Sequence, residues 1–400
     1  MAIRIKVAQT PNELEDAFGL RYQVSVGEEG YLDANSFPDE MVIDSYDRKS
    51  HVVNIVAYAD SGAVGTMRIH LELGQDNPPG AQNQVGDIYQ DLASSWSEEC
   101  DEQPRVGAIS MLAVRRTWRH RRDVIRAMFK LAAGVAQAWS CTHMLAVSNP
   151  KTSGIYERVG FKTMEGSYRL ECFGGHVAPM TCEFSKFHHW AFAGLAGSLK
   201  MLDFFSHRFQ RLILAPEENV FRQGDRQGEA YIIDSGAIRI SKGGPSGEEL
   251  TLATLGRGQM FGELALIDTQ PRSAHATTLA MTELIALDGE EFFNALEDQP
   301  HRIRGILRLF SERLRRTDEL AFVMVHGSAR QRIEHALLDI RKMAMPDEKR
   351  PGTVIARISL AELARQAGVC EADVHGYLET KKHSRNLEFN TRRIRFLNAG

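Results

Sequence analysis

A short stretch of this chain, from Phe261 to Ala274, combines residue types that suit a phosphorylated sugar. Glu263 offers a carboxylate to a sugar hydroxyl, and Arg272 offers a planar fork that can place two charge-assisted hydrogen bonds on a phosphate. Glycine at position 262 lets the backbone approach a ligand closely, and the amides of the turn that it opens suit an anion. The spacing therefore predicts a site for a cyclic phosphodiester on a ribose. We expect the ligand to contact Gly262, Glu263, Leu264, Arg272 and Ser273.

Residues 212–300 as a whole resemble the cyclic-nucleotide-binding domain of the catabolite activator protein and of cyclic-nucleotide-dependent kinases and channels. Besides the stretch above, Gly224-Asp225 and the segment Tyr231–Arg239 match the glycine-punctuated strand pairs of that family. The resemblance implies a β-roll, or jelly roll, that binds a cyclic nucleotide, with cAMP favoured over cGMP. The alternative is a generic β-roll in which Arg272 and Glu263 merely pair with each other.

Residues 301–326 follow the expected β-roll and carry an apolar stripe in alternating steps of four and three. Its members are Ile303, Leu307, Phe310, Leu314, Thr317, Ala321 and Met324. A stripe with this spacing is typical of a helix that pairs with a second helix, so we expect a homodimer, although the helix could also pack on its own β-roll. In the resembled family the matching helix offers a Thr-Ser pair to the purine. Thr317 and Asp318 stand at those places here, and the carboxylate at 318 leaves the choice between adenine and guanine open.

Residues 327–400 have a helix-turn-helix layout and resemble the winged helix of the catabolite activator family. Ser359 can cap a helix over Glu362, Gly368 can make the turn, and Val374 can anchor the second helix. The expected recognition helix starts with Glu371, Ala372 and Asp373, whereas base readout and phosphate contact favour cationic and amide side chains. The cations that could still contact phosphates are Lys381, Lys382, Arg385, Arg392, Arg393 and Arg395. DNA remains an open partner.

Residues 1–184 predict a sheet with helices on its faces, because strand and helix patterns alternate along them. We expect strands near 3–8, 52–59, 63–72, 107–114 and 142–147, helices near 11–25, 123–139 and 151–158, and two closing strands near 166–184. Asp76–Gly80 reads as a loop, ahead of a poorly patterned stretch that includes Trp96.

This N-terminal region resembles acyltransferases of the GNAT type. The resemblance is carried by Ile109–Val114, by Arg119-His-Arg-Arg122 at the start of a helix, and by Ile155–Phe161. It implies that backbone groups near Leu112 and Val114 hold the acyl carbonyl, that Arg119 and Arg122 receive the donor's phosphates, and that Tyr156 protonates the leaving thiolate. The family's two phosphate-loop glycines are replaced here by Arg122 and Val124, which disfavours close backbone contact with a pyrophosphate.

A second resemblance is to acyl-homoserine-lactone synthases and N-acyl amino acid synthases, relatives of the same fold that commonly take acyl chains from acyl carrier protein. It rests on Arg21-Tyr22, Gly30-Tyr31, Asp44-Ser-Tyr-Asp47 and Gly65-Thr-Met-Arg68. It implies a catalytic cleft in which Asp44 and Asp47 handle the ammonium of an amino-acid-like acceptor. Arg21 and Arg68 would then bind the acceptor's carboxylate. The alternative is that these four charges form ordinary surface salt bridges.

Composition bounds the class of protein. The chain has 400 residues, 43% hydrophobic and 25% charged, which indicates a soluble multi-domain protein. Five scattered cysteines form neither a disulfide framework nor a zinc cluster, so we expect a cytoplasmic protein without a metal site. Residues 327–400 carry 14 Lys and Arg against 9 Asp and Glu, a net +5, and the first 184 carry 18 against 24, a net −6. An aromatic connector at 185–211 could pack between domains or lie on a membrane surface.

The sequence thus predicts five parts: a GNAT-like domain at 1–184, a connector helix at 185–211, a β-roll at 212–300, a dimerisation helix at 301–326 and a winged helix at 327–400. Two functions fit this order. The first is an N-acyltransferase that moves an acyl group from acyl carrier protein or coenzyme A to an amine under the control of a cyclic nucleotide. The second is a cAMP-responsive transcription regulator whose N-terminal domain senses a ligand or is inactive.

Overall fold

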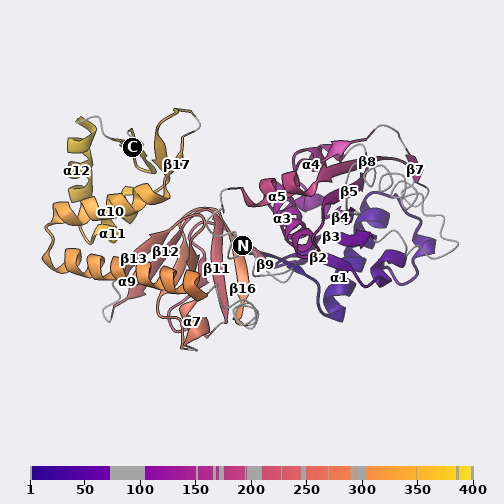
Figure 1. Cartoon of the computed structure of the whole chain (residues 1–400), viewed down its shortest axis with the longest axis horizontal. Helices are drawn as coiled ribbons and strands as arrows, with labels where there is room; N and C mark the ends of the chain where they lie inside the picture. Colours follow the sequence, from indigo (N-terminus) through magenta and orange to yellow (C-terminus); the bar gives the residue numbers. More distant parts are fainter. Residues whose placement is uncertain are drawn as a thin grey trace. The chain divides into compact units, whose positions relative to one another are not determined.

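The computed structural model divides the chain into two compact units, Met1–Ile213 and Leu214–Gly400, which we describe separately (Figure 1). The described residues are 2–72, 104–149, 152–164, 168–170, 175–193, 195, 210–226, 228–244, 249–268, 270–289, 293, 303–347, 349–383 and 387–397. The predicted loop at Asp76–Gly80 and the stretch around Trp96 lie outside these residues.

The first unit is built on one sheet with strand order β9-β1-β2-β3-β4-β5-β8-β6, and β7 pairs with β8. The bounds are β1 Ile3–Val7, β2 Val52–Ala59, β3 Gly62–Glu72, β4 Val106–Val114, β5 His143–Ser148, β6 Lys162–Thr163, β7 Tyr168–Leu170, β8 Gly175–Glu183 and β9 Gln210–Leu214. Neighbouring strands run antiparallel, except that β4 and β5 are parallel. The mixed sheet agrees with the expected alternation of strands and helices.

Helices cover both faces of this sheet. On one face, α1 (Pro11–Tyr22) places Ala17 and Leu20 in a cluster with Val56 and Ala113, which lie in register with Thr66 of β3. On the other face, Met128 of α3 (Arg122–Ala138) lies 3.2 Å from the position that a Cβ would take on Gly65. Adjacent residues of a strand point to opposite faces, so α1 and α3 sandwich the sheet.

Local sequence explains where α1 begins. The Thr10 hydroxyl accepts a hydrogen bond from the Glu13 amide, the Glu13 carboxylate accepts one from the Thr10 amide, and Pro11 takes the first helical position.

The start of the expected connector forms a helix of the first unit, α5 (Phe184–Phe192). It packs against α3, and its Phe187 is fully buried against the rings of Phe129 and Phe161. This part therefore packs as a core helix rather than presenting a membrane-facing surface. Residues 196–209 lie outside the described part of the chain.

The second unit begins with a β-roll made of two antiparallel sheets, β14-β11-β16 and β10-β15-β12-β13. The strands are β10 Asn219–Phe221, β11 Glu229–Ser235, β12 Ile238–Gly243, β13 Glu249–Leu255, β14 Met260–Phe261, β15 His275–Thr278 and β16 Thr282–Asp288. A one-turn helix, α7 (Leu264–Ile267), follows β14 and leads to Arg272.

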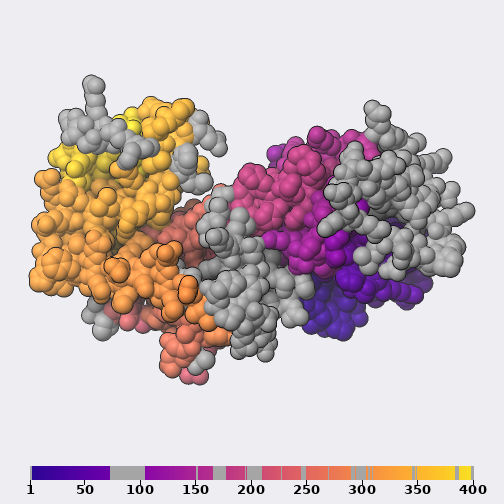
Figure 2. Space-filling view, in the orientation of Figure 1, coloured from indigo at the N-terminus to yellow at the C-terminus, as the bar shows by residue number. Residues whose placement is uncertain are grey.

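The long helix α9 (Ile303–His326) follows the roll and lies at the surface of the second unit (Figure 2). Its predicted apolar stripe is largely exposed: Leu307 and Leu314 are 58% and 64% accessible. Phe322 and Val325, outside the predicted stripe, are exposed as well. The helix therefore carries more apolar surface than its own β-roll covers.

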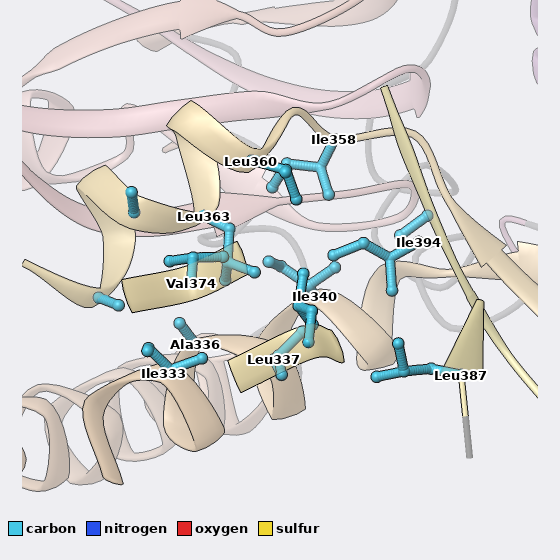
Figure 3. Close-up of a cluster of buried hydrophobic side chains, with 14 of the residues drawn as sticks. Ile333, Ala336, Leu337, Ile340, Ile358, Leu360, Leu363, Val374, Leu387 and Ile394 are labelled. Carbon is cyan, nitrogen blue, oxygen red and sulfur yellow. The ribbon is translucent and has the colours of Figure 1, made fainter. Parts of the chain in front are cut away.

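The C-terminal part consists of three helices and a small antiparallel sheet of order β17-β18-β20-β19. The bounds are α10 Ala329–Met343, β17 Met345–Pro346, β18 Val354–Ala356, α11 Leu360–Ala367, α12 Glu371–His383, β19 Leu387–Asn390 and β20 Arg393–Phe396. Ser359 caps α11 by accepting from the Glu362 amide, and Gly368 ends it at φ +59°. Side chains from all three helices and the sheet share one core, in which Val374 and Ile340 are fully buried (Figure 3).

Within the second unit, α11 is fixed to the β-roll by buried polar contacts. Arg239 of β12 donates to the Glu362 carboxylate at 2.7 Å, and Thr254 of β13 donates to the Gln366 side chain at 3.0 Å. All four side chains are buried. The C-terminal module is therefore held to the roll by a buried ion pair rather than by exposed charges.

This ion pair gives a stability prediction. Replacing Glu362 with alanine removes the shortest and most buried ion pair of Arg239, which then keeps only the longer contacts to Glu217 at 3.7 Å and Glu249 at 4.0 Å, at a cost of up to about 3–5 kcal/mol. We expect hydrogen exchange of amides in α11 and β13 to accelerate accordingly. Arg365→Ala removes the other, half-exposed cation on the same carboxylate and is the matched control, with a change within about 0.5 kcal/mol. Equal exchange in Glu362→Ala and wild type would show that the ion pair does not hold the module.

Candidate functional sites

Arg272 lies in the wall of the β-roll, where the sequence predicts the phosphate contact. Its guanidinium donates to the carbonyl oxygens of Gly262 and Glu229, both at 2.6 Å, and lies 4.2 Å from the Phe221 ring centroid. Its Nε atom is buried and has no hydrogen-bond partner. Burial lowers the pKa of Arg272, opposed by nearby Tyr231 and Glu229. Since a guanidinium has five N–H donors, three remain for an anion.

Glu263 is fully buried beside this arginine, but the two do not form a hydrogen-bonded pair. Glu263 instead accepts from Arg313 of α9, which also donates to the Met260 carbonyl oxygen. The second carboxylate oxygen of Glu263 has no partner. Burial raises the pKa of Glu263, opposed by the charges of Arg313 and Arg272. Arg272 and Glu263 therefore bond to other groups rather than to each other.

Arg272 thus has an Nε atom without a partner, and Glu263 has a carboxylate oxygen without one. An anionic oxygen next to a hydroxyl group satisfies both, which is the pairing found in a ribose cyclic phosphate. Gly262 adopts φ +80°, and a Cβ there would stand 3.0 Å from Arg272 Nη1, so the turn requires glycine.

The other predicted nucleotide contacts lie at the surface. Leu264 and Ser273 are exposed at the edge of the turn. Thr317 and Asp318 are exposed on α9, where the Thr317 hydroxyl donates to the Arg313 carbonyl oxygen. Arg313 was missed from the sequence, although its position four residues before Thr317 on the same helix was an available signal.

In the first unit, β4 and β5 separate at the point where the sequence places an acyl group. Their parallel pairing runs from Val106 opposite His143 to Ile109 opposite Ala146, and then stops. Beyond it, β4 bulges: Met111 takes φ +52°, and the register with β3 shifts between Thr66 and Arg68. The half-buried residues Ser110, Met111 and Leu112 line the opening, and Val114 ends the strand. A bulge of this kind releases backbone hydrogen-bonding groups toward a ligand.

The expected phosphate loop is occupied by acidic side chains. Arg119 pairs with Glu28 at 2.7 Å and with Glu29, and the Arg116 amide donates to Glu28 at 2.9 Å. Arg122 is the first residue of α3 and is exposed. A phosphate that approached Arg119 would meet two carboxylates first, which opposes the binding of a pyrophosphate at this point.

Tyr156 of α4 (Ser153–Glu157) lies in an aromatic cluster and is only 3% exposed. Its ring meets Phe129 edge-on at 5.2 Å and Phe161 at 5.9 Å. Burial raises the pKa of Tyr156, so the phenol keeps its proton. The role of proton donor to a thiolate stays a prediction, and the packing gives Tyr156 a clear part in the core as well.

The four charged residues predicted to line the cleft do come together. Arg21 and Asp47 are each 1% exposed and pair at 2.9 Å, with Asn54 accepting another bond from Arg21. Arg68 donates to Asp44 at 2.9 Å, contacts Asp47 at 3.0 Å and donates to Ser110 at the opening of β4. The four residues therefore do form salt bridges, as the alternative predicted, but these salt bridges are largely buried rather than on the surface.

Only Asp44 of this group keeps partial access to solvent, with 33% of its side chain exposed. Hydrogen bonds and charge from Arg68, with the Tyr46 amide, hold the pKa of Asp44 below its usual value against the opposing effect of burial. The geometry therefore offers one accessible carboxylate, positioned by a buried network.

Two findings from the described residues bear on location and metals. No α-helix among them combines the length and apolar composition that a membrane crossing requires. Within the same part of the chain, no three histidine, cysteine, aspartate or glutamate side chains converge as metal ligands would.

Known families match a part of each unit. Residues 16–183 match the family model of the N-acyl amino acid synthase FeeM, and residues 211–299 match the model of the cyclic nucleotide-binding domain. The chain therefore joins an N-acyl amino acid synthase domain of the FeeM type to a cyclic nucleotide-binding domain.

The curated proteins that match this chain include regulators named for cyclic AMP. The cyclic AMP receptor protein of Thermus thermophilus is 34% identical over 137 residues, which cover 34% of this chain and 63% of that protein. A CRP-like cAMP-activated global transcriptional regulator of Mycobacterium tuberculosis is 28% identical over 164 residues, covering 41% and 73%. Among solved structures, the catabolite activator protein of Thermus thermophilus is 28% identical, with a TM-score of 0.29 and coverage of 51% of this chain and 92% of that one.

Proposed function

We propose that this chain, which joins an N-acyl amino acid synthase domain to a cyclic nucleotide-binding domain, is an N-acyltransferase regulated by a cyclic nucleotide. The single observation that carries the catalytic part is the opening between β4 and β5, with Ser110 at its start joined through Arg68 to the accessible Asp44. An acyl thioester held along β4 would lie beside a carboxylate suited to an ammonium. This placement would correspond to the acyl site that the resemblance to GNAT-type acyltransferases implies.

For the acyl donor, we propose acyl carrier protein rather than coenzyme A. The phosphopantetheine arm of a carrier protein brings one phosphodiester, whereas coenzyme A adds a pyrophosphate that would reach the loop where Glu28 and Glu29 hold Arg119. Arg122, exposed at the start of α3, remains available to a single phosphate.

For the acceptor, we propose an amine that binds through its ammonium to Asp44. Arg21, Arg68 and Asp47 are engaged with one another, so their part is to position Asp44 rather than to bind the acceptor's carboxylate directly. The amine attacks the thioester carbonyl, and Tyr156 is the proposed proton donor to the departing sulfur.

For the regulator, we propose cAMP, the ligand in the names of both curated relatives. The phosphate would bind Arg272 and the ribose hydroxyl would donate to Glu263. The exposed stripe of α9 would pair two copies of the chain, which would bring Thr317 and Asp318 to the base. Such a ligand regulates only if it binds the active and inactive states with different affinities.

A second candidate is a DNA-binding regulator, favoured by the intact core shared by α10, α11 and α12 and by the types of the relatives. The charges on the expected recognition helix and around it argue against this candidate. Glu371 and Asp373 are exposed at the start of α12, while Lys382 and Arg395 are paired with acidic neighbours. Arg392 and Arg393 remain exposed.

One experiment separates the two. The purified full chain is incubated with acyl carrier proteins and coenzyme A carrying acyl chains of several lengths, and with a panel of amino acids and other amines, and products are detected by mass spectrometry. We expect an N-acyl product and a faster reaction with the carrier-bound donor. If no pair yields product while the chain binds a preferred DNA sequence, the regulator is correct and the enzyme proposal fails.

A further inference from the structure

Among the described buried side chains of the first unit that have polar atoms without hydrogen-bond partners, three lie together on one side of the sheet. They are the Tyr46 hydroxyl, both ring nitrogens of His70 and one carboxylate oxygen of Glu72. His70 is only 3% exposed. A buried polar group without a partner costs about 1–3 kcal/mol, so three in contact need a reason.

The three groups lie close to one another. The ring centroids of Tyr46 and His70 are 4.6 Å apart, and His70 Nε2 lies 3.4 Å from a Glu72 oxygen, a contact that becomes an ion pair when the imidazole is protonated. The Lys49 Nζ atom also contacts this group: it lies 3.8 Å from a Glu72 carboxylate oxygen and 4.4 Å from the Tyr46 ring centroid. Polar atoms that converge in this way can share a polar ligand or water.

The position of His70 relates this cluster to the proposed acyl site. Residues 68, 70 and 72 of β3 alternate onto one face of the sheet, so His70 and Glu72 share the face on which Arg68 reaches Asp44. Arg68 stands in register with Ser110, at the opening of β4, and His70 with Ala108. His70 therefore lies one pair of cross-strand neighbours from the place where β4 and β5 separate.

The charges around His70 favour the neutral imidazole. Burial lowers the pKa of His70, and the cations Arg68 and Lys49 lower it further, while Glu72 alone opposes them. Burial also raises the pKa of Tyr46, to about 12, so the phenol stays uncharged. A neutral imidazole keeps one ring nitrogen free to accept a proton, which is what a base requires.

We propose that His70 is the base that removes a proton from the acceptor's ammonium, with Glu72 and Tyr46 as positioning residues. This inference rests on the proposed function. The ammonium gives one proton to His70 and becomes a neutral amine. Its nitrogen forms a bond to the thioester carbonyl carbon, the carbon–sulfur bond breaks, and the second proton reaches the departing thiolate. His70 then releases its proton to solvent, so the products are an amide, a thiol and one proton.

The test is His70→Gln in the full chain, assayed with the donor–acceptor pair that gives product with wild type. We expect kcat/KM to fall about 10²- to 10⁴-fold, with KM for the donor unchanged. His51→Gln is the matched control, because His51 belongs to the same unit and its side chain is exposed. The control should keep full activity.

A second variant keeps the inference testable if His70→Gln does not fold. Glu72 raises the pKa of His70, so Glu72→Gln should move the acidic limb of the kcat/KM profile, measured from about pH 5.5 to 9, to lower pH. A merely structural Glu72 would change the rate without moving this limb.

The outcomes distinguish this inference from the proposed function. Wild-type rate and profile in both variants overturn the role of His70 and leave the acyltransferase intact. Absence of product from wild type with every pair overturns the acyltransferase itself, and the role of His70 with it.

Discussion

Arg272→Ala is expected to weaken cAMP binding by about 2–5 kcal/mol, roughly 30-fold to several thousand-fold in Kd. Arg272 is buried, and three of its N–H donors, including the unpartnered Nε, remain for a phosphate after two have bonded to the carbonyl oxygens of Gly262 and Glu229. Isothermal calorimetry and the shift of the thermal midpoint by cAMP measure the loss.

The control for this prediction must separate ligand loss from damage to the fold. Arg272 also supports the carbonyl groups of Gly262 and Glu229, so the ligand-free thermal midpoint of the variant is measured alongside. Arg226→Ala, which removes an exposed cation of the same loop region, should keep the wild-type response. An undiminished cAMP response in a folded Arg272→Ala variant would remove the nucleotide site from where we place it.

Asp47→Asn is expected to lower the free energy of unfolding of the first unit by about 3–5 kcal/mol. The substitution leaves Arg21, 1% exposed, without its nearest counter-charge. All four tryptophans of the chain, at positions 96, 118, 139 and 190, belong to the first unit, so tryptophan fluorescence during urea unfolding reports this unit selectively.

Asp44→Asn is the matched comparison, and it should behave differently. Asp44 is one-third exposed, and Arg68 retains Asp47, so stability should change far less while acyl transfer falls. Equal stability losses in the two variants would contradict the division of labour between a positioning Asp47 and a substrate-binding Asp44.

Much of the fold follows from sequence pattern. The strands expected near 3–8, 52–59, 63–72 and 107–114 appear as β1 to β4, because alternating apolar residues and helix signals such as Thr10, Pro11 and Glu13 are local. The two domains were also identified, from motifs that depend on residue type at fixed spacing: Gly262-Glu263 with Arg272, and Arg21, Asp44, Asp47 and Arg68.

What the sequence did not reveal depends on contacts between distant segments. Local spacing places Arg313 on the same face of α9 as Thr317, but it does not reveal that Arg313 pairs with Glu263 or that Glu28 and Glu29 pair with Arg119. The burial of Arg21 and Asp47 likewise depends on how α1 packs on the sheet. Because they are buried, we propose that they position Asp44 rather than bind the acceptor. His70 and Glu72 gave a signal, since they alternate with Arg68 on an otherwise apolar strand, but it was not used.

The most direct test of the central claim is the initial rate of N-acyl product formation by the full chain, with and without saturating cAMP, in wild type and Arg272→Ala. We predict that cAMP changes the wild-type rate and that the variant, folded and active, keeps one rate in both conditions. A wild-type rate that is the same with and without cAMP, under conditions where calorimetry shows cAMP bound, would contradict regulation of the acyltransferase by this nucleotide.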